Sequence, residues 1–213
     1  VINNFEDDDL EAMFIAKKIR DLEKQSFSLS QIAILTRASF QFKDIEDRFL
    51  KENIKYKVVG GLRFYERAEI KDAISYLKLL INKSDNLSLE RILNVPKRGL
   101  GKALIKKLYD ISNIENLSLF ESLKKFYEEG KLTVNQKTNV KNFIQIIQNH
   151  TLMLKKYDHF EVCGSLLDDV GYTKMLQAEK TPESEGRLEN LKKLITDLKN
   201  INSIEEFLEE VSL

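Results

Sequence analysis

Hydrophobic positions up to about residue 61 follow two alternating patterns. Short apolar or β-branched runs at 1–5, 32–35 and 56–59 have the length and composition of strands. Between them, residues 8–25 and 39–53 place apolar side chains three or four positions apart, which is the spacing of an amphipathic helix. We therefore predict the beginning of an α/β sheet, in which parallel strands are joined by helices.

After Gly60 and Gly61 the pattern becomes almost entirely helical. This order predicts a mostly α fold, in which a helical domain is inserted into a partial α/β domain whose later strands lie beyond residue 213. We expect the partial α/β domain at 1–82 and the helical domain at 83–213. The predicted helices cover residues 67–82, 88–94, 102–112, 118–128, 133–157, 160–170, 183–200 and 203–211.

Several residues mark expected helix ends. Ser118 followed by Glu121 has the spacing of a capping box, in which each side chain bonds the backbone of the other residue. The other signals are helix-start residues at Ser84 and Asp85, a first-turn Pro182, and helix-stop glycines at Gly130 and Gly171.

Composition narrows the class of protein. The chain has 34 basic and 34 acidic residues, so no overall field draws it to nucleic acid or membrane, and any anion site must be local. One cysteine excludes an internal disulfide and a thiolate zinc site, and it fits a reducing compartment. The chain has no apolar run long enough to span a bilayer, and its start is acidic, so we expect a cytoplasmic protein.

Familiar catalytic motifs do not occur in the sequence. It has no GxxxxGK[ST], GxGxxG or HExxH. His150 and His159 are nine positions apart, on different faces of any helix, and Cys163 has the apolar neighbours of a buried thiol. We expect no metal site and no complete active site in these residues.

A first candidate site is the end of the apolar run at 32–35. Thr36 and Arg37 follow it directly, at the position where α/β proteins bind ligands beyond the carboxyl ends of their strands. An arginine there could bind a phosphate through its planar fork of N–H donors. A surface arginine at the end of a strand is the alternative interpretation.

A second candidate is a glycine turn, Gly99-Leu100-Gly101, between two predicted helices. Such a turn is typical of a helix-hairpin-helix, where a backbone without Cβ atoms lies against phosphate and the next helix offers free amides. A plain C-cap glycine followed by a solvated lysine face is the alternative. The basic side chains around the turn belong to Lys97, Arg98, Lys102, Lys106 and Lys107, and contacts to phosphate would carry no sequence specificity.

The order of these features resembles the UvrD/PcrA/Rep family of superfamily 1 DNA helicases. The resemblance is carried by AILTRASFQFKDIEDRFLKENIKYKVVGGLRFYERAEIKDAISYLKLLIN and LERILNVPKRGLGKALIKKL, with DLEAMFIAKKI before them and YTKMLQAEKTPESEGRLENLKKLI after them. It covers essentially the whole chain. It implies the start of the second RecA-like domain, called 2A, with motif IV, followed by its helical insertion, 2B.

The resemblance also implies roles for individual residues. Arg37 would be the motif IV arginine finger at the γ-phosphate of ATP, while Thr36 replaces the family's usual adenine-stacking tyrosine and cannot stack. The turn at 99–101 would correspond to the element through which 2B grips duplex DNA. The junction into 2B would act mainly in hinge motion and packing; its residues here are Gly60, Gly61, Phe64, Arg67 and Glu69.

The implied protein is an ATP-dependent 3′ to 5′ DNA helicase that uses ATP and Mg²⁺ and acts on forked duplex DNA, with repair proteins as possible partners. Walker A, the Mg²⁺-binding acidic pair and motifs V and VI lie outside these residues, so we expect this piece alone to bind no cofactor and to hydrolyse no ATP. Two alternatives stay open: a DNA-binding helical module without a motor, and a helical adaptor that binds protein.

Overall fold

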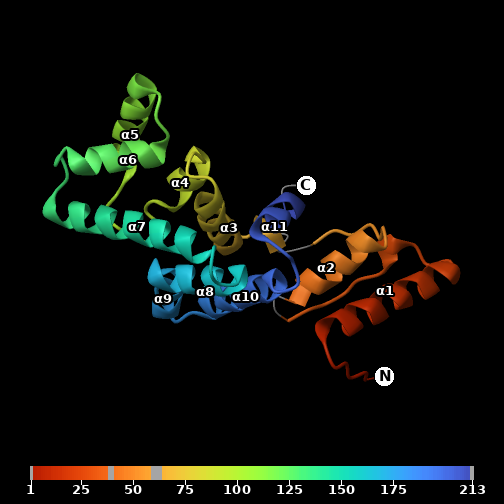
Figure 1. Ribbon diagram of the computed structural model, residues 1–213. Helices are drawn as coiled ribbons and strands as arrows, with labels where there is room; N and C mark the ends of the chain where they lie inside the picture. Colours follow the sequence, from red (N-terminus) through yellow and green to blue (C-terminus); the bar gives the residue numbers. More distant parts are fainter. Residues whose placement is uncertain (1, 38–40, 59–63, 212–213) are drawn as a thin grey trace. The chain divides into compact units, whose positions relative to one another are not determined.

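The computed structural model describes residues 2–37, 41–58 and 64–211. The chain divides into two compact units, Val1–Arg67 and Ala68–Leu213, and each is described by itself (Figure 1). Gly60 and Gly61, expected at the hinge, lie outside the described residues. The predicted boundary of the two family domains at 82/83 stays a prediction.

The first unit is built on two helices that pack against each other, α1 (Asp8–Lys24) and α2 (Phe42–Lys51). Two 3₁₀ turns accompany them, η1 (Leu29–Gln31) and η3 (Phe64–Glu66). The apolar stripes of both helices meet in a small core, as their spacing predicts. Its buried members are Ala16, Ile19, Phe49 and Ile54.

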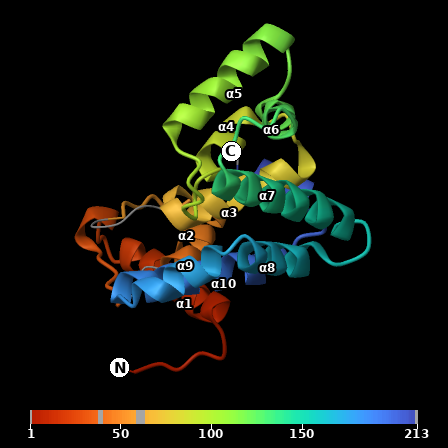
Figure 2. The ribbon, with the colours of Figure 1, turned by 90° about the vertical axis from the view of Figure 1, so that its left-hand side faces the viewer.

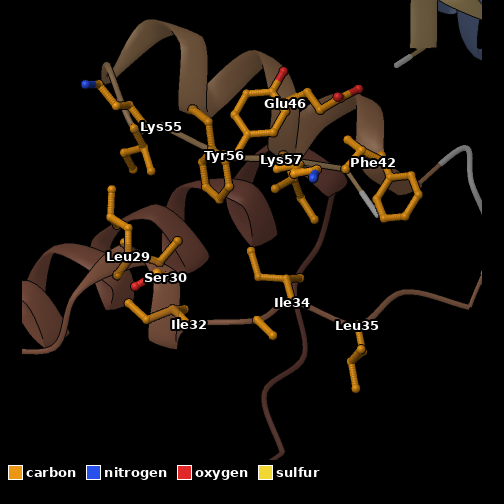
Figure 3. Close-up of a pocket in the computed structure, with 16 residues that line it drawn as sticks. Leu29, Ser30, Ile32, Ile34, Leu35, Phe42, Glu46, Lys55, Tyr56 and Lys57 are labelled. Carbon is orange, nitrogen blue, oxygen red and sulfur yellow. The ribbon is translucent and has the colours of Figure 1, made fainter. Parts of the chain in front are cut away.

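The predicted strands are wrong within the described residues, since 2–5, 32–35 and 56–58 form none. Ile32 has an extended backbone, but a strand also needs a neighbouring chain within hydrogen-bonding distance. The segments around Ile32 and Tyr56 instead lie on opposite sides of a pocket (Figure 3). Leu35 is 94% exposed, so the apolar run is not buried as a central strand would be.

The second unit consists of helices only, within residues 68–211. In Figures 1 and 2, α7 lies between a group formed by α4, α5 and α6 and another formed by α8, α9 and α10. The mostly α prediction is therefore confirmed. The helices are α3 (Ala68–Ile81), α4 (Asn86–Ile92), α5 (Lys102–Glu115), α6 (Leu119–Glu128), α7 (Val134–Met153), α8 (His159–Asp169), α9 (Tyr172–Glu179), α10 (Pro182–Leu198) and α11 (Ile204–Glu210).

Helix α3 is the centre of this unit and contacts α4, α7, α10 and α11. Most of its residues are buried, which agrees with its high apolar content. Two buried carboxylates on α3 have specific partners: Asp72 accepts from Arg91 and Tyr172, each at 2.7 Å, and Glu69 accepts from Asn190 at 2.6 Å. These bonds stabilise charges that would otherwise be costly to bury.

The predicted helix ends are largely confirmed. Ser118 and Glu121 form the capping box, the Asp85 side chain accepts from the Ser88 amide, and Pro182 is the first residue of α10. Helix α9 was not predicted, because Gly171 was interpreted only as the end of α8. With φ at +78°, Gly171 also serves as the N-cap of α9.

Candidate nucleic-acid interface

The glycine turn connects α4 to α5 through residues 93–101. Gly99 has φ at +70°, a conformation that glycine adopts without strain. Leu100 is completely buried and anchors the turn to the interior, so its side chain is not available for contact with DNA. Gly101 is exposed and is the N-cap of α5.

The start of α5 offers backbone donors. The Gly101 carbonyl accepts from the Leu104 amide at 2.9 Å, but no side chain caps the helix. Within the described ranges, the amides of Gly101, Lys102 and Ala103 have no acceptor. A methyl group added at Gly101 would meet nothing within 4 Å, so the surface beside the Cα atom of Gly101 is open. Such amides, with the positive end of the helix dipole, favour an anion.

Lysine side chains surround this helix start. Lys97, Lys102 and Lys106 are exposed and make no ion pair with any described residue. Lys107 is also exposed, and its ammonium lies 5.8 Å from the centre of the Phe126 ring. The four lysines make the surface around the turn locally positive, although the whole chain is neutral.

Arg98 has a different role from the one its sequence position suggested. Its guanidinium donates to the Tyr76 hydroxyl at 2.7 Å and to the Val170 carbonyl at 3.1 Å. It also donates to three carbonyls within 92–96 and lies 5.1 Å from the centre of the Phe143 ring. Because both terminal nitrogens of its guanidinium donate to groups of the protein itself, we remove the Arg98 side chain from the candidate DNA contacts. A sequence cannot show which basic residue of a cluster turns inward.

Arg37 is exposed and forms no ion pair with the described residues. It follows Thr36, whose buried hydroxyl oxygen has no hydrogen-bond partner among the described residues. The guanidinium is thus available to an anion, as its chemistry allows.

The junction residues are packed inside their own units. In the first unit Phe64 is 1% exposed, and the Arg67 guanidinium lies 5.3 Å from its ring centre. The Glu46 carboxylate accepts from the Phe64 amide at 3.4 Å, and burial raises the pKa of Glu46. In the second unit Glu69 is bonded to Asn190. These contacts agree with packing and leave these side chains little access to DNA.

A pocket of about 660 Å³ lies in the first unit, between the segments around Ile32 and Tyr56 (Figure 3). Its lining is mainly apolar and includes Ile34, Phe49 and Ile54, with Glu46 among the polar residues. Its polar lining residues are Ser30, Glu46, Lys55, Tyr56 and Lys57, and we assign it no ligand.

The remaining candidate groups have structural roles. Burial raises the pKa of the Cys163 thiol to about 12, so the thiolate is strongly disfavoured. The Nε2 atom of His159 is 2.6 Å from the Leu198 carbonyl, and His150 is buried in α7. The described residues bring no three metal-binding side chains together, and none of their helices is long and apolar enough to cross a membrane.

Comparison with known proteins decides the family. The family described as UvrD-like helicase C-terminal domain matches residues 1–213. The chain belongs to this family. It is 38% identical over 204 residues to a probable DNA helicase II homolog of Rickettsia conorii, covering 95% of this chain and 31% of that protein. It is 37% identical over 197 residues to the ATP-dependent DNA helicase PcrA of Bacillus subtilis, covering 92% of this chain and 26% of that protein.

These relatives confirm the resemblance to UvrD/PcrA-type helicases and support a role in a DNA helicase. The chain spans less than a third of the length of either relative. The comparisons do not assign functions to single residues, so the roles of Arg37 and of the glycine turn are proposals.

Proposed function

We propose that this chain carries the motif IV segment and the duplex-binding 2B domain of an ATP-dependent DNA helicase with 3′ to 5′ polarity. The observation that carries the proposal is the glycine turn, where uncapped amides of α5 lie among exposed lysines. A DNA backbone presents phosphates at regular intervals, which such a surface binds irrespective of sequence. The lysines proposed to contact DNA are Lys97, Lys102, Lys106 and Lys107, with the backbone of Gly99 and Gly101.

In the complete helicase, Arg37 would bind the γ-phosphate of ATP and stabilise the charge that develops during phosphoryl transfer. Its exposed guanidinium fits this role. ATP bound with Mg²⁺ would supply the free energy for movement along one strand. The described residues contain no cluster of acidic side chains that fits Mg²⁺, so we assign no metal ligand in this chain.

The first unit fits a partial RecA-like domain. The segments around Ile32 and Tyr56 both line a mainly apolar pocket, and Leu35 remains exposed. These uncovered apolar groups fit a unit that packs against further structure, and insertion of the helical unit into a sheet is part of the proposal. Rotation of the helical unit about the junction near Gly60 and Gly61 is part of the same proposal, as are a cytoplasmic location and action on forked DNA.

A titration of the 213-residue chain with labelled forked duplexes of two unrelated sequences tests the proposal. The double variant Lys97→Ala/Lys102→Ala should bind both duplexes more weakly and by the same factor. The slope of log K against log salt should fall in magnitude by roughly 0.9 for each lost phosphate contact. The variant Lys155→Ala/Lys156→Ala, which removes two exposed lysines elsewhere, is the matched control.

Unchanged binding by the Lys97→Ala/Lys102→Ala variant would reject the turn as a DNA contact. If the parent chain binds no duplex at all, a protein-binding adaptor becomes the better interpretation. If the chain binds DNA but the longer protein shows no DNA-stimulated ATP hydrolysis, the module without a motor is favoured.

A further inference from the structure

We propose that Asn94, Gln136 and Asn139 are positioning residues that hold the glycine turn in its phosphate-binding conformation. This inference rests on the proposed function of the turn. None of the three needs to contact DNA. They act through hydrogen bonds to the backbone of residues 98–100, and they come from two different elements, the chain after α4 and the first turns of α7.

Asn94 holds the turn from the α4 side. Its side-chain oxygen accepts from the Arg98 amide at 2.8 Å and from the Leu100 amide at 3.1 Å. One acceptor thus joins two amides that are two residues apart, which curves the backbone around the side chain. The Leu100 side chain is buried in the same curve. These two donors are therefore bound internally, while the amides of residues 101–103 stay without a described acceptor.

Two side chains of helix α7 bind carbonyl groups of the same backbone. The Asn139 side chain donates to the Arg98 carbonyl at 2.8 Å, and the Gln136 side chain donates to the Gly99 carbonyl at 3.0 Å. A free carbonyl oxygen beside a phosphate would repel it, because both carry negative charge. By binding these two carbonyls, α7 removes two partly negative oxygens from competition with the amides of residues 101–103, which have no described acceptor. This arrangement favours an anion.

The prediction is that Asn94→Ala weakens binding of the forked duplex about tenfold, because the competent turn becomes a minor conformation. The number of phosphate contacts in the bound state does not change, so the salt slope should equal that of the parent chain. This separates a positioning residue from Lys97 and Lys102, whose removal reduces the slope. The matched control is Asn142→Ala, which removes an exposed asparagine side chain of α7 that has no hydrogen bond to described residues.

Gln136→Leu and Asn139→Ala test the same inference independently of Asn94. Both residues are only half-buried, so the chain should fold, which circular dichroism can check. Each should weaken duplex binding without a change in slope. Amide hydrogen exchange supplies a readout without DNA: exchange at Leu100 should become faster in Asn94→Ala and stay unchanged in Asn142→Ala.

The inference is wrong if all three variants fold and bind the duplex like the parent. It is also wrong if the salt slope of Asn94→Ala falls in magnitude by the roughly 0.9 that one lost phosphate contact causes. If the proposed function itself is wrong, Lys97→Ala/Lys102→Ala would also bind the duplex like the parent chain. Weaker binding by the lysine variant together with normal binding by Asn94→Ala would overturn the positioning role alone.

Discussion

Replacing Arg98 by alanine should destabilise the helical unit, whereas replacing its neighbour Lys97 should not. Truncation of Arg98 removes the donor to the Tyr76 hydroxyl and to four backbone carbonyls. A buried acceptor that loses its partner costs about 1–3 kcal/mol, but these groups are only part-buried and water can reach some of them. We expect a total loss of about 3 kcal/mol in the free energy of unfolding.

For a unit of this size, such a loss corresponds to a decrease in Tm of roughly 9 °C. Urea denaturation and thermal denaturation followed by circular dichroism measure both quantities. Lys97→Ala removes an exposed side chain and should stay within about 0.5 kcal/mol of the parent. If Arg98→Ala were as stable as Lys97→Ala and lost a phosphate contact in the salt titration instead, the assignment of Arg98 to the interior would be refuted.

Further predictions concern other residues. Gly99→Ala should destabilise the chain by about 1 kcal/mol in urea, because alanine is strained at φ +70°, and an unchanged free energy of unfolding would contradict this. Gly101→Ala should weaken duplex binding, because its methyl group stands beside the proposed phosphate site, and normal binding would contradict this. Iodoacetamide should modify Cys163 at pH 8.5 at least about a hundredfold more slowly in the native chain than in urea, and equal rates would show that the thiol is not buried. In the longer helicase, Arg37→Ala should lower ATP turnover on the order of 10³-fold with little change in nucleotide binding, and normal turnover would exclude a catalytic role.

The helices could be predicted from sequence because their signals are local. Apolar spacing places α3 and α7 near their observed bounds, and the capping box at Ser118 marks the start of α6. Helix α9 was missed because Gly171 both ends one helix and begins the next. These outcomes depend on a few neighbouring residues, which a sequence shows directly.

The absence of strands from the described residues and the role of Arg98 could not be predicted, because both depend on distant partners. An apolar run such as 32–35 becomes a strand only where another segment pairs with it, and in the described residues none does. Arg98 turns inward because Tyr76 and Val170, far away in sequence, offer acceptors. The hydrogen bonds from Gln136 and Asn139 to the turn also join segments that are distant in sequence, and the pattern of basic residues contains no signal for them.

Backbone amide chemical shifts, measured while the chain is titrated with forked duplex DNA, test the central claim most directly. The account predicts that the largest changes occur at Gly101, Lys102 and Ala103, with smaller changes at Lys106. Saturable binding with unchanged amides at 99–103 and shifts confined to another face would contradict it.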